Sequence, residues 1–324
     1  MIGISSAETT EPSDQPRKLV ATPVASDRIF RALSTSAASV ALVIIVATLV
    51  FLINESRPAL SSSGIWHFFT SSTWDASAGR FGVMGLLLGT VIIATLAMAV
   101  ALPLGLAMAL FINEYAPPRA SRVLTSVVDL LAALPSLIFG MWGRDAFAGR
   151  LGPVARWFGD HLVAIPLFRI DDGAVLGSSS FVAGIVVGVM ILPIITSISR
   201  DVMAQVPREQ CEGALALGGT RSAMIRSVVL PFGKKGIIGA ALLAFGRALG
   251  ETIAVAIIIA PQTKVNWHVL EKGAGSIAAQ IAIRFGEASA VERSGLVATG
   301  LALMMLTITV SIGARRLVVR GGTR

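Results

Sequence analysis

Charged residues, cysteine and histidine are all scarce in this sequence. Only 14% of its 324 residues are charged, against about 25% in a soluble domain, and 54% are hydrophobic. The composition therefore predicts an integral membrane protein. The single cysteine, Cys211, excludes an intrachain disulfide and is expected to be a reduced, small core residue. No metal is expected, because ligand spacing is absent from the three histidines: His67, His161 and His268.

The motifs of nucleotide hydrolysis and of common enzyme chemistry are missing too. The segment Gly233-Lys234-Lys235 lacks both the upstream glycine and the following hydroxyl residue of a phosphate-binding loop. No pairing of a nucleophile with a base is indicated. We therefore expect a chain that is not an enzyme and holds no cofactor. The net charge of +8 does not indicate a nucleic-acid partner, because the basic residues concentrate at the ends of apolar runs.

Long apolar runs are what the sequence does contain. A membrane-spanning helix needs about 20 mostly apolar residues. Six runs meet this length and predict an all-α integral membrane fold with about six transmembrane helices: 34–53, 83–112, 124–143, 180–199, 237–260 and 296–314. The second run contains Pro103, and the third contains Asp129 and Pro135. These residues favour a kink or tilt in the second run and make the third the weakest candidate.

The distribution of lysine and arginine predicts the orientation. The basic side receives both chain ends and the segment 207–231, so these are expected to be cytoplasmic. Residues 1–30 are polar and lack a leading apolar segment, which indicates a cytoplasmic tail rather than a signal peptide. The outer loops are then 54–82, 144–179 and 261–295. In the last loop, Ile277, Ile281 and Phe285 recur at helical spacing and indicate either an amphipathic helix at the pore entrance or a solvated loop.

The segment 207–231 is polar and contains glycine, although it lies between two apolar runs. Pro207 and the acidic Glu212 favour a short helix, since proline and acidic side chains suit a helix N-terminus. Gly218 suits the left-handed stop of that helix, and Thr220 suits the N-cap of a second one. The predicted structure is a rigid, basic helix-turn-helix elbow for contact with another protein. A generic loop is the alternative.

Two charges lie near the middle of the run 237–260. Placing Arg247 at the centre of a helix costs about 2.5–3.5 kcal/mol on insertion scales, so it must face a bundle interior or a water-filled path. Glu251 follows at i+4, on the same helix face, where it could pair with Arg247. Gly246 and Gly250 leave space beside them, and Thr252 could add a hydroxyl donor. The pair either contacts an anion in transit or only fixes helix packing.

These motifs resemble those of permeases from binding-protein-dependent ATP-binding-cassette (ABC) importers. The elbow signature reads Glu212-Gly213-Ala214, three residues, Gly218, nine residues, then Val228-x-Leu230-Pro231, with Gly213 and Val228 departing from the usual Ala and Ile. The segment Arg247-Ala-Leu-Gly-Glu251-Thr252-Ile-Ala-Val is similar to that of phosphate permeases of the PstC type. Two further stretches fit: Pro103–Pro117 and Ala133-Leu134-Pro135-Ser136 through Gly140. The resemblance covers residues 81–315 and implies the type I importer (MetI-like) fold.

The composition, the apolar runs and the resemblance together predict a domain order. It begins with the cytoplasmic tail (1–30) and a first transmembrane helix with its outer loop (31–80). The permease core (81–315), with the coupling elbow at 207–231, and a basic cytoplasmic tail (316–324) follow. In the elbow, the implied contacts with the ATPase are Glu212, Gly213, Ala214, Gly218, Leu230 and Pro231. The implied substrate path contains Arg247, Glu251, Thr252, Pro135 and Ser136.

A complex in the bacterial cytoplasmic membrane is the last implication of the resemblance. The chain would work with a PstA-type permease in the lipid bilayer and with a homodimeric PstB-type ATPase that binds ATP and Mg²⁺. An external PstS-type phosphate-binding protein would deliver the ion. The expected function is phosphate import. The alternatives are a permease for sulfate or molybdate, an intramembrane enzyme and a stand-alone channel.

Overall fold

The computed structural model describes residues 25–147, 149–162, 164–171, 174, 176–259 and 261–320. Residues 1–24 of the predicted N-terminal tail (1–30) lie outside the described residues. The last four residues of the predicted C-terminal tail (316–324) lie outside them as well. The chain divides into two compact units, residues 1–50 and 51–324. The first helix, α1 (Ala25–Ser63), runs through the boundary between them. All features described below belong to the second unit unless α1 is named.

Five helices are long and apolar enough to cross a membrane among the described residues. They are α1, α3 (Met84–Leu110) with the π-helix η1 (Phe111–Tyr115), α7 (Ser180–Met203), the continuous stretch Arg221–Leu249, and α13 (Ala290–Arg320) up to Gly313. The predicted spans 34–53, 83–112, 180–199 and 296–314 are thereby confirmed. The all-helical membrane fold is confirmed as well, with a bent helix pair as the sixth candidate.

The predicted span 124–143, the weakest of the six, is not one continuous helix but a bent helix pair. Helices α4 (Pro118–Ala132) and α5 (Ser136–Phe147) meet at an angle of 97°. Pro135 lies in the break, where it has no amide hydrogen to donate and disfavours helical backbone before it. Glycines then allow α5 to cross its neighbours closely: a Cβ on Gly140 would lie 2.8 Å from Ala254 Cα, and one on Gly143 would lie 2.4 Å from Val186 Cγ2.

The core of this unit is built on the contact between α3 and α7. Gly184 and Gly188 of α7 face α3, and a Cβ on Gly188 would lie 3.0 Å from the carbonyl oxygen of Ala97. Ala97 and Ala101 are completely buried. Small residues of this kind let two helix backbones approach closely, which is how helices associate inside lipid, where apolar burial gives no advantage.

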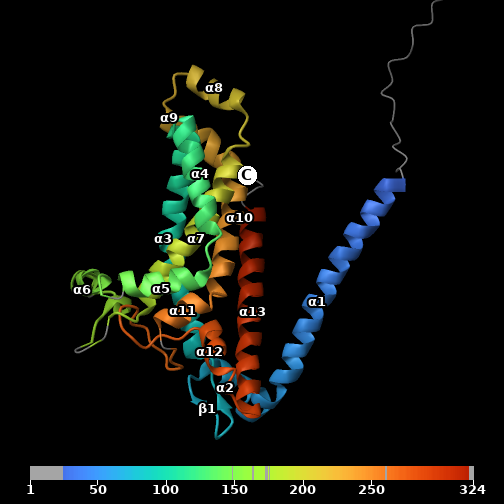
Figure 1. Ribbon diagram of the computed structural model, residues 1–324, viewed down its shortest axis with the longest axis vertical. Helices are drawn as coiled ribbons and strands as arrows, with labels where there is room; N and C mark the ends of the chain where they lie inside the picture. Colours follow the sequence, from blue (N-terminus) through green and yellow to red (C-terminus); the bar gives the residue numbers. More distant parts are fainter. Residues whose placement is uncertain are drawn as a thin grey trace, which may run out of the picture. The chain divides into compact units, whose positions relative to one another are not determined.

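The two ends of the unit carry different elements (Figure 1). One end holds the elbow, with α8 (Arg208–Ala216), α9 (Arg221–Met224) and the π-helix η3 (Ile225–Val229), which leads into α10 (Leu230–Leu249). The other end holds α2 (Ile65–Thr70), an antiparallel hairpin of β1 (Trp74–Asp75) and β2 (Arg80–Phe81), and α12 (Ile277–Arg284). Helix α6 (Leu151–His161) and the 3₁₀ turn η2 (Pro166–Phe168) follow α5.

The predicted amphipathic segment in the last outer loop is a helix, α12. Ile277 is fully buried and packs with α3 and α13, whereas Phe285, just beyond the helix, is 42% exposed. The loop before α12 lies in a groove made by two glycines of α3. A Cβ on Gly85 would lie 2.0 Å from the carbonyl oxygen of Thr263, and one on Gly89 would lie 2.0 Å from that of Gly275. The loop before α12 therefore packs closely against α3.

Candidate translocation and coupling sites

The predicted helix 237–260 is interrupted next to its two charges. Helix α10 ends at Leu249, and α11 (Ile253–Ile258) begins after a three-residue break. Gly250 has φ −90° and ψ 2°, and its N–H still donates to Gly246 O at 3.3 Å. The hydroxyl of Thr252 donates to Gly250 O at 3.0 Å, which holds the break locally. The side chain of Thr252 is thus already used within the break.

The predicted pairing of Arg247 with Glu251 is wrong, because the two side chains form no ion pair with each other. Glu251 lies beyond the end of α10, so the i, i+4 geometry of a continuous helix is lost. Its Oε1 instead accepts a hydrogen bond from the backbone N–H of Ala254 at 3.1 Å, and the residue is 6% exposed. A carboxylate is stable at this position because it caps the positive N-terminal end of α11.

Both charged residues nevertheless line one cavity of about 990 Å³. Its walls come from α7, α10 and α13, and Gly246 and Gly250 are part of them. The guanidinium of Arg247 approaches only Met190 Sδ, at 4.0 Å, and has no carboxylate partner in the described part of the chain. Lys235, which the sequence reasoning missed, lines the same cavity. It precedes Arg247 by 12 residues, about 3.3 helical turns, so helical spacing alone does not place the two residues on one face. The cavity is therefore lined by two cations and one carboxylate.

Pro135 and Ser136 lie elsewhere. They stand at the break between α4 and α5, where Pro135 is exposed and Ser136 is half-buried. Neither residue is among those that line the cavity with Arg247. Their predicted place on the substrate path stays a prediction.

The elbow has the backbone geometry that its sequence predicts. Helix α8 starts after Pro207, and Gly218 has φ 81°, in the left-handed region. The N–H of Gly219 donates to Ala214 O at 3.3 Å, which closes the end of α8. The Thr220 hydroxyl oxygen accepts from the N–H of Ala223 at 3.2 Å and caps α9.

The surface of this elbow is exposed. Glu212, Gly213 and Gly218 are exposed, Ala214 is half-buried, and no residue of α8 is buried. Leu217, at the C-terminal end of α8, is 91% exposed. Leu230 and Pro231 form the first turn of α10, directly behind η3.

Cys211 lies on the inner side of the elbow, where it packs against a small cluster that contains Met203 and Met224. Burial raises the pKa of its thiol, and the negative charges of Glu114 and Glu212 raise this pKa further. The residue therefore keeps its proton at neutral pH, consistent with the small, unreactive core residue that the sequence indicates.

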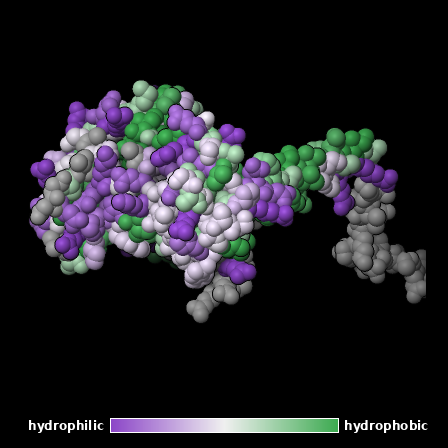
Figure 2. All heavy atoms as spheres, turned by 90° about the horizontal axis from the view of Figure 1, so that it is seen from below, coloured by the Kyte–Doolittle hydropathy of each residue, from purple (hydrophilic) through white to green (hydrophobic). Residues whose placement is uncertain are grey.

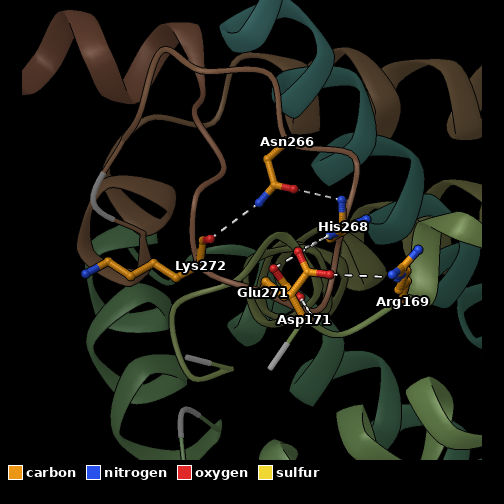
Figure 3. Close-up of polar contacts among 6 residues, drawn as sticks. All are labelled: Arg169, Asp171, Asn266, His268, Glu271 and Lys272. Carbon is orange, nitrogen blue, oxygen red and sulfur yellow. Dashed lines mark hydrogen bonds and ion pairs between the residues drawn. The ribbon is translucent and has the colours of Figure 1, made fainter. Parts of the chain in front are cut away.

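A polar cluster ties together two segments that are about 100 residues apart in sequence (Figure 3). His268 Nδ1 lies 3.5 Å from Asp171 Oδ2 and 3.7 Å from Glu271 Oε2, and the backbone N–H of Asp171 donates to Glu271. Arg169 Nε lies 3.7 Å from Asp171 Oδ1, and Asn266 Oδ1 accepts from the N–H of His268 at 2.8 Å. Histidine spacing alone could not reveal this cluster, because Asp171 reaches it only through the fold.

Comparison with known proteins assigns the chain to a family. Residues 101–321 match the model of the family described as "Binding-protein-dependent transport system inner membrane component". The chain belongs to this family. It is a multi-pass membrane protein and a transport subunit, and the ABC importer permease fold expected from the elbow and Arg247 motifs is confirmed.

Several curated relatives cover nearly the whole permease. This chain is 39% identical over 294 residues to "Phosphate transport system permease protein PstC 2" of Mycobacterium tuberculosis. The alignment covers 89% of this chain and 90% of the relative. The chain is 34% identical over 297 residues to "Phosphate transport system permease protein PstC" of Xylella fastidiosa, with 91% of each chain covered.

The crystal structure of a bacterial ABC transporter involved in the import of the acidic polysaccharide alginate has a similar fold. The TM-score is 0.58, at 16% identity, with 92% of this chain and 100% of that chain covered. At this identity the likeness shows the fold alone.

Proposed function

We propose that this permease is one of two membrane subunits of an ATP-driven inorganic phosphate importer and forms half of its translocation path. The observation that carries the proposal is the alignment with proteins named as phosphate permeases, at 33–39% identity over most of both chains. The cavity beside Arg247 gives the proposal a chemical basis, since an anion needs a cation that is not already neutralised.

Arg247 suits an oxyanion better than a lysine does. A guanidinium presents a planar fork of donors that can form two parallel hydrogen bonds to phosphate oxygens. Because Glu251 is held at the N-terminus of α11, it lines the cavity without neutralising Arg247. The negative charge of Glu251 weakens the binding of a nearby anion and so favours its release. A transport path needs such weak binding, because a tightly bound anion would not leave the site.

The elbow is the proposed contact with the ATPase. In this proposal a homodimeric PstB-type ATPase binds ATP and Mg²⁺ and docks on the elbow. The docking residues are four exposed ones, Glu212, Gly213, Gly218 and Pro231, and two half-buried ones, Ala214 and Leu230. The elbow and both chain ends then face the cytoplasm of a bacterium, and α2, the β-hairpin and α12 face outward. A PstA-type permease completes the path, lipid surrounds both subunits, and a PstS-type binding protein delivers phosphate from outside.

Uptake of labelled phosphate in cells that lack this gene tests the proposal. Wild-type chain should restore uptake at low phosphate concentration, and Arg247→Gln should abolish it while the complex still assembles. Lys234→Gln is the matched control, because it removes a cation from the same helix outside the cavity. Uptake restored equally by Arg247→Gln would contradict the role of Arg247. A wild-type chain that restores sulfate or molybdate uptake, and not phosphate uptake, would contradict the substrate.

A further inference from the structure

Two adjoining cavities, of about 460 and 320 Å³, lie at the end of the unit opposite the elbow. They share three lining residues, Pro261, Gln280 and Arg284. Arg144 of α5 lines the larger one, and Lys264 of the loop before α12 lines the smaller one. Three cations from three separate segments thus face one space, which we call the vestibule.

The balance of charge in the vestibule is positive. The only carboxylate paired with its cations in the described part of the chain is Glu292. Its Oε1 lies 3.9 Å from Arg284 Nη1 and accepts from Trp74 Nε1 at 3.2 Å. Arg144 and Lys264 form no ion pair with any described residue. A cavity that gathers cations in this way raises the local concentration of anions.

Gln280 is the buried polar side chain of the vestibule. It is 2% exposed and lines both cavities, and its amide forms no hydrogen bond with a described residue. Its amide N–H₂ is a suitable donor for an oxyanion that occupies the vestibule.

The vestibule is linked to the cavity of Arg247 by one short element. Glu251 lines the Arg247 cavity just before α11, and Ala256 to Ile259, in the second half of this helix and just after it, line the vestibule. Helix α11 has six residues and is therefore about 9 Å long. The two positively charged sites thus lie at either end of a helix shorter than two full turns.

We propose that the vestibule is an outer oxyanion-binding site, formed by Arg144, Lys264, Gln280 and Arg284, that an anion occupies before it reaches Arg247. The direction of passage rests on the proposed function as an importer. Figure 2 shows this end of the unit as a mainly hydrophilic face, with hydrophobic side chains gathered along part of its rim, as expected of a surface that meets water.

The wall of the vestibule is fixed in place. The loop that carries Pro261 and Lys264 lies in the glycine groove of α3, and its continuation is held by the polar cluster around His268 (Figure 3). Because the wall is already ordered, the binding of an anion does not carry the entropy cost of ordering it.

A substrate-independent test measures the charge of the vestibule. In the purified transporter with Cys211→Ser, the sequence offers no other thiol. Ser178→Cys then places a thiol in the vestibule wall, and Ser61→Cys places a reference thiol on an exposed surface. Relative to Ser61→Cys, the Ser178→Cys thiol should react at least tenfold faster with an anionic sulfonate reagent than with a cationic trimethylammonium reagent of equal size. Arg144→Gln with Arg284→Gln should remove this preference. An equal preference at both thiols, or one unchanged by the arginine substitutions, would overturn the proposal.

Uptake kinetics test whether transport uses the vestibule. Arg144→Gln with Arg284→Gln should raise KM for labelled phosphate about tenfold or more, the loss expected for charge-assisted hydrogen bonds, with little change in the maximal rate. Arg293→Gln, a nearby cation that stacks on Phe285 and lies outside the vestibule, should leave KM unchanged. An unchanged KM in the double variant would refute the role in transport. A wild-type chain that carries no phosphate would instead contradict the proposed function, and the thiol measurement would still decide on the anion site.

Discussion

Replacing Gly218 with alanine should destabilise the folded elbow. The size of the effect should depend only on backbone strain at this position. Gly218 has φ 81°, and an added Cβ would meet no atom within 4 Å. The cost is therefore the strain of a left-handed L-residue, about 1–2 kcal/mol, without any clash. Helix α8 has no buried residue to compensate, so the strain should appear as local opening. One to two kcal/mol corresponds to a factor of about 5–30 in the opening equilibrium.

Hydrogen exchange of the purified transporter measures this opening. Amides of α8 and its C-terminal turn should exchange about 5–30 times faster in Gly218→Ala than in the wild type. Gly213→Ala is the matched control: it lies in the same exposed helix, also with nothing within 4 Å, but in helical backbone. There alanine should stabilise by about 0.5–1 kcal/mol and slow exchange. If both variants changed exchange in the same direction, the argument from the left-handed backbone would be refuted. If exchange rose in Gly218→Ala and ATPase activity stayed coupled to transport, rigidity of the elbow would not matter for coupling.

Three other predictions follow from packing, titration and capping. Gly89→Ala should lower the thermal midpoint of the purified transporter by several degrees, because its Cβ would lie 2.0 Å from the carbonyl oxygen of Gly275, whereas Gly313→Ala, in open space, should not. The raised pKa of Cys211 means that its thiolate forms only at higher pH. Alkylation by N-ethylmaleimide should therefore still be rising above pH ~8.5, and a rate that levels off below this pH would contradict the burial argument. Thr220→Ala should cost about 1 kcal/mol of elbow stability by removing the cap of α9, seen as faster exchange, and Thr220→Ser should restore it.

The sequence predicted the elbow well because each of its signals is local. The conformation of Gly218 and the cap at Thr220 depend on a few neighbouring residues, and both are as expected. Prolines were less informative. Pro103 and Pro193 lie inside continuous helices, whereas Pro135 marks a bend of 97°. Whether a proline bends a helix or lies inside a continuous one thus cannot be predicted from the proline alone.

The site was predicted in part for the same reason. Arg247 and Glu251 were expected to lie together, and they do line one cavity. Their pairing was wrong, since Glu251 caps a helix whose start at Ile253 the apolar run 237–260 conceals. The vestibule could not be found from sequence, because Arg144 and Arg284 are 140 positions apart and meet only in the fold.

The continuous helical stretch Arg221–Leu249 has a mechanical consequence. It begins in the elbow and ends two residues after Arg247, so the two sites lie about 39 Å apart along one rod. A tilt of about 5° at the elbow would displace the guanidinium by ~3 Å, about the length of one hydrogen bond. A small rotation at the elbow is thus enough to make or break a contact of the Arg247 guanidinium.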